Sequence, residues 1–237
     1  MNIIGKSDIG KVRKENQDSF WFKKISQTSC VAVVWDGMGG ANGGKQASSL
    51  AVEVVRETFE KSVGKNIPQS IQSCTQEANR LVYQIALKDP NLLGMGTTLV
   101  MAIIDGNTAY LANIGDSRAY HITNGSIVQI TKDHSAVQEL VDSGHLTERQ
   151  AKIHPNKNVI TRAIGIEEEI EHDLFKVEVS AGDIILLCSD GMSNNMDENE
   201  IQFEASGEDF EDLATRLIDL ANSRGGSDNI TIAAVQI

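Results

Sequence analysis

Aspartates recur where apolar segments of this chain end or begin, each beside glycine, serine or asparagine. The four clearest lie in VAVVWDGMGG (Asp36), AYLANIGDSRAY (Asp116), DIILLCSDGMS (Asp190) and GGSDNITIAAVQI (Asp228), and Asp18 lies earlier in RKENQDSF. A carboxylate at the point where a buried strand surfaces costs free energy unless a partner compensates its charge. Several converging carboxylates would also repel one another and require cations between them. The pattern therefore predicts a site for hard divalent metal ions, built at strand ends.

The composition is typical of one compact unit. Of 237 residues, 41% are hydrophobic and 23% are charged, which is enough to bury a sizeable core. Only three prolines and no flexible linker interrupt the sequence, so we expect a single domain over residues 1–237 and a monomer. The formal net charge of −12 argues against nucleic acid as a partner, because phosphate backbones require lysine and arginine surfaces.

The cysteines and the N-terminal residues indicate a cellular compartment. Cys30, Cys74 and Cys188 are an odd number and stand far apart, which predicts reduced core thiols rather than a disulfide or a zinc site. No apolar run approaches the length of a membrane span, and the first residues lack the apolar core of a signal peptide. We therefore expect a soluble, cytoplasmic protein with no membrane partner.

Apolar periodicity locates the main helices. Residues 31–35 form a continuous apolar run, which is typical of a buried strand. Apolar residues at helical spacing then predict two amphipathic helices, one from Ala47 to Phe59 and one from Ile71 to Ile85. A third amphipathic helix is predicted between Phe210 and Ala221, and residues 135–153 have a more polar helical character.

Residues 97–131 contain four short β-rich runs, TTLVMAII, TAYLANI, RAYHI and SIVQIT. Asp105-Gly106 and Asn124-Gly125 are strong hairpin signals between them, so we expect an antiparallel meander. Further strands are predicted at 174–179, 183–188 and 230–236. Hairpin-linked strands with separate helix pairs predict an α+β fold in which helices cover the outer faces of the sheets.

The ligand chemistry favours Mg²⁺ or Mn²⁺, which bind oxygen and commonly keep several waters. Asp36-Gly37 is the most suggestive pair, because Gly37 has no side chain to keep its backbone carbonyl away from a metal. The five histidines show no ligand spacing, which argues against zinc. Each motif alone has a plainer explanation: an Asp-Gly pair is usually a turn, Asp116 could cap a turn, and Asp228-Asn229 could form an Asx-turn.

Eight segments follow one another in a recognisable order: SDIGKVRKENQDS, VAVVWDGMGG, GMGTTLVMAII, AYLANIGDSRAY, TKDHS, HPNKNVITRAIG, LLCSDGM and GGSDNITIAAV. In this order they resemble the bacterial branch of the metal-dependent protein serine/threonine phosphatases, the protein phosphatase 2C type. The resemblance extends essentially from end to end. It implies a four-layer αββα sandwich, with two antiparallel sheets flanked by pairs of helices and a small flap subdomain, in agreement with the α+β expectation.

The resemblance also implies ligands for two central metal ions, Mn²⁺ or Mg²⁺. Asp36 resembles the carboxylate that bridges both ions, and the Gly37 carbonyl resembles a ligand of one of them. Asp190 and Asp228 resemble ligands of the other ion. Asp18 resembles an acid that acts mainly through metal-bound water.

Further residues resemble parts of the family's machinery around these ions. Asp116 resembles the residue that, with the Asp190 equivalent, holds a third, weaker ion. Arg13 resembles the arginine that grips the substrate phosphate, a task that suits a guanidinium fork. The segment of about 142–165 resembles the variable flap. Met38 stands where the eukaryotic branch has a histidine proposed as general acid, which leaves the leaving-group acid unassigned.

These roles predict hydrolysis of phosphoserine and phosphothreonine on proteins by metal-activated water, without a phosphoenzyme. The expected partners are phosphorylated proteins and a bacterial serine/threonine kinase that the protein opposes. One alternative is a phosphatase specialised for a single regulatory partner, such as an anti-sigma-factor antagonist in a stress pathway. Another is a catalytically weak module that binds phosphoproteins; it would require a lost metal ligand, whereas the full set is present.

Overall fold

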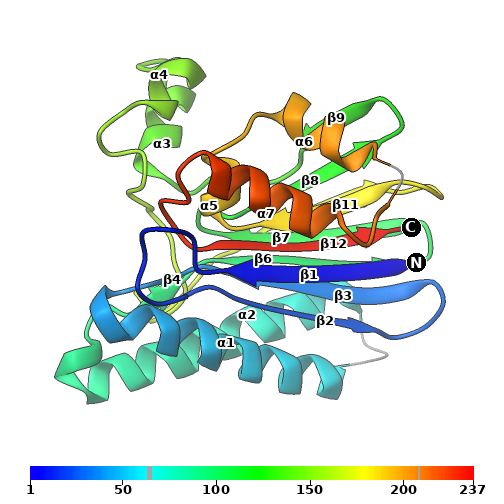
Figure 1. Cartoon of the computed structure of the whole chain (residues 1–237). Coiled ribbons are helices and arrows are strands. Elements are labelled where there is room, and N and C mark those ends of the chain that lie inside the picture. Colours follow the sequence, from blue (N-terminus) through cyan, green and yellow to red (C-terminus); the bar gives the residue numbers. More distant parts are fainter. Residues whose placement is uncertain (63–65, 208) are drawn as a thin grey trace.

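Two antiparallel five-stranded sheets stack face to face, and helices cover both outer faces (Figure 1). The computed structural model describes residues 1–62, 66–207 and 209–237. The four-layer α+β arrangement predicted from the sequence is confirmed.

The first sheet has the strand order β1–β12–β11–β8–β9. These strands are β1 (Asn2–Asp8), β12 (Ile230–Gln236), β11 (Ile184–Cys188), β8 (Arg118–Thr123) and β9 (Ser126–Gln129). The two strands β11 and β12 are buried along almost their whole length. They are sandwiched between the other sheet and a helical layer, which explains why their sequences are continuous apolar runs rather than alternating ones.

The second sheet has the order β10–β7–β6–β3–β2. Its strands are β10 (Asp173–Glu178), β7 (Thr108–Ile114), β6 (Leu99–Asp105), β3 (Ser29–Trp35) and β2 (Ser19–Lys24). The inner strand β3 is buried on both faces, whereas the edge strand β10 alternates between half-buried and exposed residues. A separate short pair, β4 (Gly37–Met38) and β5 (Gly96–Thr97), lies beyond the end of β3.

The helices divide the core into three apolar layers. The long helices α1 (Gly40–Ser62) and α2 (Ile67–Lys88) pack on the second sheet, and a 3₁₀ turn, η1 (Pro90–Leu92), follows them. The first sheet is covered by α5 (Asp190–Ser193), α6 (Glu198–Ala205) and α7 (Leu213–Ser223). The third layer fills the space between the sheets. All three cysteines are buried and free, as predicted.

The predicted four-strand meander over residues 97–131 is wrong. The structure contains two hairpins in different sheets: β6 pairs with β7, and β8 pairs with β9. Between β7 and β8 the chain crosses from one sheet to the other at Gly115 (φ +100°), where a Cβ would lie 2.6 Å from the Thr98 side chain. The Asn113 amide secures this corner by donating to the carbonyls of Gly115 and Lys132. The corner carries Asp116 between the two sheets.

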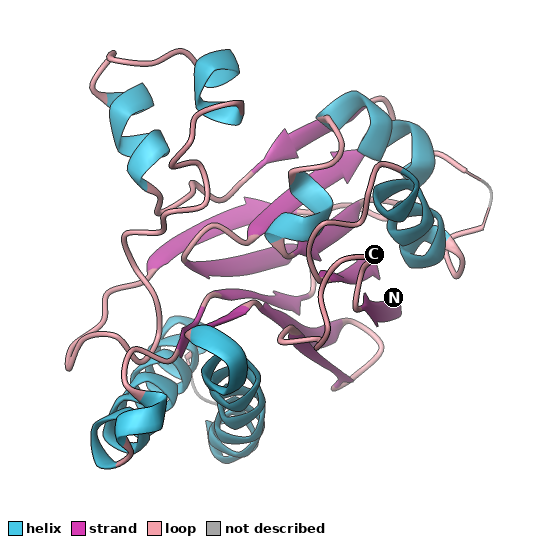
Figure 2. Cartoon of the chain, turned by 60° about the vertical axis from the view of Figure 1, so that its left-hand side comes forward, coloured by secondary structure: helices cyan, strands magenta, loops and turns pink. Residues whose placement is uncertain are grey.

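The predicted polar helix over residues 135–153 is two short helices, α3 (Ala136–Asp142) and α4 (Glu148–Lys152). The break follows α3 at Gly144, whose φ of +75° is a left-handed conformation that glycine adopts readily. Both views show this pair of helices projecting from one end of the sandwich (Figures 1 and 2). Across the described residues, no helix combines the length and apolar character that a membrane crossing requires.

Candidate active site

Asp36 follows β3 and is fixed there through its backbone. Its N–H donates to the Thr98 hydroxyl (3.0 Å), and its carbonyl accepts from the Thr98 N–H (2.9 Å) and the Thr97 hydroxyl (3.0 Å). A Cβ at Gly37 would lie 2.2 Å from the Gly44 carbonyl oxygen in α1. The glycine is therefore required by close packing between β4 and α1, and this Asp-Gly pair is a rigid corner rather than a free turn.

Asp18, at the end of the N-terminal loop, is only 2% exposed. The Ser189 hydroxyl donates to its Oδ2 (2.7 Å) and accepts from the Thr231 N–H (2.9 Å). This chain of contacts connects the N-terminal loop to the ends of β11 and β12. The second carboxylate oxygen of Asp18, Oδ1, is buried and has no hydrogen-bond partner.

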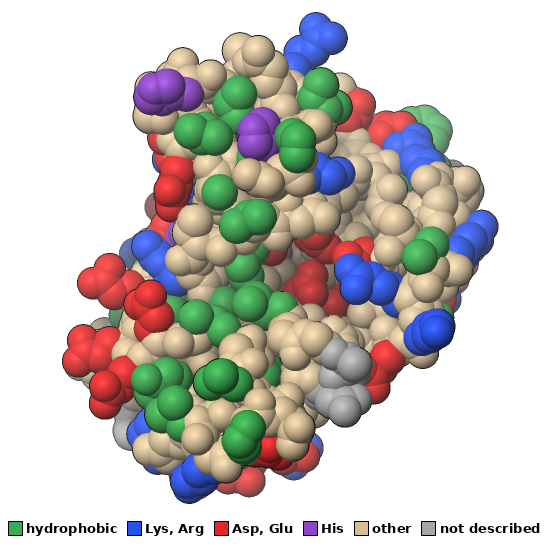
Figure 3. Space-filling model, turned by 90° about the vertical axis from the view of Figure 1, so that its left-hand side faces the viewer, with side chains coloured by type: hydrophobic (Ala, Val, Ile, Leu, Met, Phe, Trp, Pro, Cys, Tyr) green, Lys and Arg blue, Asp and Glu red, His purple; other side chains and the backbone are tan. Residues whose placement is uncertain are grey.

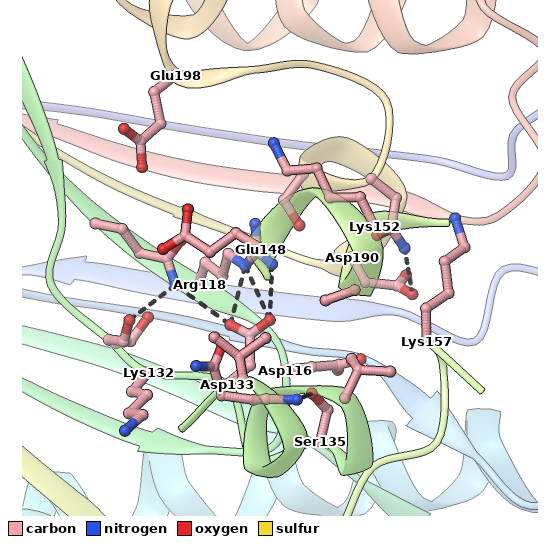
Figure 4. Close-up of a pocket in the computed structure, with 18 of the residues that line it drawn as sticks. Asp116, Arg118, Lys132, Asp133, Ser135, Glu148, Lys152, Lys157, Asp190 and Glu198 are labelled. Atoms are coloured by element: carbon pink, nitrogen blue, oxygen red, sulfur yellow. Dashed lines mark hydrogen bonds and ion pairs between the residues drawn. The ribbon is translucent and has the colours of Figure 1, made fainter. Parts of the chain in front are cut away.

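Asp190 and Asp116 each line two neighbouring cavities on this side of the molecule, which are described below. Asp190 begins α5 directly after β11; the Asn194 amide donates to its Oδ2 (3.0 Å), and its Oδ1 is buried without a partner. Both aspartates line a pocket of about 700 Å³ together with Asp36 and Asp228, which we call the aspartate pocket. Both also line a second hollow of about 480 Å³ beside α3 and α4, shown in Figure 4.

Asp228 precedes β12 and pairs with Arg13 at 2.7 Å. The neighbouring Asn229 connects this strand end to the N-terminal loop. Its side chain bonds three backbone groups of that loop: the carbonyls of Ile9 and Glu15 and the N–H of Gln17. Asn229 therefore positions both Arg13 and Asp18. The sequence suggested only an Asx-turn at this position, and a GGSDN segment carries no local signal for such distant partners.

The carboxylates are close enough to perturb one another. Burial raises the pKa of Asp36 well above its ordinary range, and the charges of four other aspartates raise this pKa further: Asp18, Asp190, Asp116 and Asp228. Burial also raises the pKa of Asp18 to about 7 and that of Asp190 to about 6, with repulsion from Asp228 contributing in both cases. All five predicted acids therefore share one electrostatic environment, as the sequence led us to expect.

These side chains fit divalent cations with a water-rich shell. No group of three or more His, Cys, Asp or Glu within the described ranges is arranged as a ready-made ligand cage. Such a cage is not needed by Mg²⁺ or Mn²⁺, which commonly keep several waters. The unpartnered oxygens of Asp18 and Asp190 are hard ligands, and cations between the acids would relieve the repulsion that raises their pKa values.

Comparison with known proteins shows which family the chain belongs to. Residues 4–231 match the family model described as Protein phosphatase 2C. The chain belongs to the protein phosphatase 2C family. It is a metal-dependent serine/threonine protein phosphatase. Over 241 residues it is 36% identical to the serine/threonine phosphatase stp of Listeria welshimeri. The alignment covers 100% of this chain and 96% of the relative.

Solved structures of the family superpose closely on this phosphatase. The crystal structure of the Mycobacterium tuberculosis serine/threonine phosphatase PstP/Ppp has a TM-score of 0.91 at 34% identity, covering 100% of this chain and 98% of that one. The catalytic domain of PstP in complex with two manganese ions has a TM-score of 0.88 at 34% identity, covering 99% and 97%. The likeness therefore includes a relative whose structure holds two metal ions.

Several polar residues of this phosphatase support the site from outside. Arg118 and Asp133 form an ion pair at 2.7 Å in the wall of the second hollow, as Figure 4 shows. His134 accepts the Gly115 N–H through Nδ1 (3.1 Å), which stabilises the corner that carries Asp116. Arg162 pairs with Asp173 at 3.1 Å. These groups stabilise the loops around the aspartate pocket rather than pointing to a reaction of their own.

Proposed function

We propose that this phosphatase binds two divalent metal ions in the aspartate pocket and uses them to hydrolyse phosphoserine and phosphothreonine in proteins. The observation that carries the proposal is the convergence of Asp36, Asp116, Asp190 and Asp228 on one pocket. Arg13 pairs with one of these acids, Asp228, which leaves most of the negative charge uncompensated in the metal-free protein. When bound, the ions would supply water of lowered pKa and neutralise charge on the phosphoryl group.

The ligands are assigned by position. Asp36 would hold both ions, and the Gly37 carbonyl would complete the shell of one of them. Asp190 and Asp228 would hold the other, and Asp18 would act through water. This assignment is supported by the burial of Asp18, by the half-buried position of Asp36 in the pocket wall and by the rigid corner at Gly37. Mn²⁺ is the favoured ion, since a relative's catalytic domain is known in complex with two manganese ions.

The remaining residues orient the substrate. Arg13 is half exposed beside Asp228, and its guanidinium would be free to grip phosphoryl oxygens once the Asp228 carboxylate served as a metal ligand. Cys188 is fully buried and burial raises its pKa to about 12, which excludes it as a nucleophile. Met38 carries no transferable proton, so the leaving oxygen takes its proton from water in the pocket rather than from a side chain at this position.

We assign a third, weaker ion to Asp116 and Asp190, which both line the aspartate pocket and the second hollow.

Protein stripped with EDTA should be inactive on p-nitrophenyl phosphate. Added Mn²⁺ should restore activity in a tight-binding phase followed by a weak-binding one. Asp116→Asn should lose only the weak phase, which calorimetric Mn²⁺ titration can resolve. Full activity in EDTA would contradict the proposed function, and an unchanged titration of Asp116→Asn would contradict the third ion alone.

Arg13→Ala should raise the KM for a phosphopeptide roughly tenfold, because a charged hydrogen-bond partner of the phosphate is lost. The loss on p-nitrophenyl phosphate should be smaller. Lys11→Ala is the matched control, since Lys11 is an exposed cation of the same loop that does not line the aspartate pocket. Equal effects of the two substitutions would contradict a phosphate contact by Arg13 and would indicate a general effect of positive charge in this loop.

The wider role is proposed on the same basis. The substrates are phosphoproteins of a cognate serine/threonine kinase that this phosphatase opposes; selective action on one regulatory partner is the second candidate. Three reduced, buried cysteines suit a cytoplasmic protein. We further propose a monomer with a single domain over residues 1–237, in which the segment of about 142–165 acts as the flap, without nucleic acid or membrane partners.

A further inference from the structure

A third hollow, of about 380 Å³, adjoins the aspartate pocket. We call this hollow the isoleucine groove. Its larger apolar side chains are those of Met38, Ile160, Ile166 and Ile170, and Ala163 also lines it. Met38 and Ile160 line the aspartate pocket as well, so the two cavities adjoin at these two side chains. A polypeptide that presents a phosphorylated residue to Asp36 would therefore pass close to the groove.

The groove is held in shape by the helical layer below it. Asn79 of α2 is only 2% exposed, and its side chain accepts the Gly165 N–H (2.7 Å). The same amide donates to the carbonyls of Glu167 and Glu168 at 3.0 and 3.1 Å. Ile166 lies against Gly96 of β5, where a Cβ would be 2.9 Å from its Cδ1. A wall fixed by buried contacts is preorganised for a ligand, which limits the entropy lost on binding.

The outer rim of the groove is strongly acidic. Glu167 and Glu171 line it, and two further exposed glutamates, Glu168 and Glu169, lie between them in the chain. No ion pair involves any of these four within the described part of the chain. The cation that lines the groove, Arg162, is already paired with Asp173. Figure 3 shows hydrophobic side chains extending from the acidic hollow toward a group of acidic side chains at the far rim.

We propose, building on the proposed function, that the isoleucine groove is a substrate-selection site for phosphoproteins. An apolar side chain next to the phosphorylated serine or threonine occupies the groove, and a basic side chain further along the substrate contacts Glu167 and Glu171. Apolar burial supplies the affinity and charge complementarity selects the sequence.

The second hollow, on the α3–α4 side, does not provide this selection. Its charges are of both signs: Arg118 pairs with Asp133 and Lys132 pairs with Asp142 at 2.7 Å, and Lys152, Lys157, Glu148 and Glu198 also line it. A substrate charge of either sign placed there would meet like charges as well as opposite ones. The isoleucine groove instead presents one apolar surface and one uncompensated sign of charge.

The test uses two series of phosphothreonine peptides. In one series Leu lies next to the phosphothreonine and Lys lies further along on the N-terminal side. In the other series the same residues lie on the C-terminal side. Reference peptides have Gly and Glu at those positions. We expect roughly tenfold higher kcat/KM for the Leu/Lys peptide on one side. Hydrolysis of p-nitrophenyl phosphate, which is too small to reach the rim, supplies the reference rate for each enzyme preparation.

Two enzyme variants assign the preference to the groove. The double substitution Glu167→Lys and Glu171→Lys should abolish or invert the Lys-over-Glu preference, and Ile166→Ala should weaken the preference for Leu. Glu211→Lys, an exposed glutamate near the start of α7, is the matched control and should keep both. Equal rates for all peptides, or a preference that survives the double substitution, would overturn the proposal. Absence of aryl phosphate hydrolysis would instead contradict the metal-dependent function itself.

Discussion

Asp36→Asn should lower phosphatase activity at least roughly a thousandfold at saturating Mn²⁺, measured on p-nitrophenyl phosphate and on a phosphopeptide. The substitution keeps the shape of the side chain and the backbone contacts with Thr97 and Thr98, but removes the charge that we assign to bridging both ions. Loss of a metal-held nucleophile removes several kcal/mol of transition-state stabilisation, which corresponds to a factor of this order.

The chain provides a matched control for this substitution. Asp105-Gly106 is also an Asp-Gly pair at the end of a buried strand of the same sheet, but Asp105 is exposed in the β6–β7 hairpin and lines none of the three hollows described. Asp105→Asn should therefore keep wild-type activity and wild-type Mn²⁺ affinity. Wild-type turnover in Asp36→Asn would show that the bridging role is misassigned, whereas equal losses in both variants would indicate a general effect on folding.

The contrast between these two Asp-Gly pairs also shows what the sequence can and cannot reveal. Periodicity identified β3, β6, β7 and the long helices, because each buries a continuous apolar surface. It could not show whether consecutive strands pair in one sheet or cross to the other. That choice depends on contacts between distant residues, such as the Asn113 amide with the Lys132 carbonyl.

The acids of the proposed site were visible in the sequence, and the residues that position them were not. Asp36 and Asp190 stood out because a carboxylate after an apolar run is conspicuous. Asn229 acts through backbone groups more than two hundred residues away in the chain, so no local pattern marks it. The isoleucine groove was missed for a similar reason: Met38 and Ile166 meet only after β4 and the segment after Ile160 fold together.

The clustered acids predict an unusual pH dependence of stability in the metal-free protein. Asp18 and Asp190 have folded-state pKa values of about 7 and about 6, both raised by burial from an ordinary value of 3.8. A carboxyl whose pKa is raised by folding contributes full stability below its unfolded pKa, and that contribution is lost as the pH rises through the folded pKa. In EDTA the free energy of unfolding should therefore fall by on the order of 3 kcal/mol between pH 5 and pH 8.

Bound Mn²⁺ should reverse this slope, because the carboxylates bind the ion only after losing their protons, so its stabilisation grows with pH. For a protein of this size, calorimetry should show the Tm in EDTA falling by roughly 5–10 °C from pH 5 to pH 8, and rising over the same range in excess Mn²⁺. Asp36→Asn removes one of the carboxyls whose pKa folding raises, so its Tm in EDTA should vary less with pH and should respond weakly to Mn²⁺. A wild-type Tm in EDTA that stays level or rises over this range would mean that the acids are compensated without metal. The electrostatic basis of the metal site would then be wrong, even if the enzyme were active.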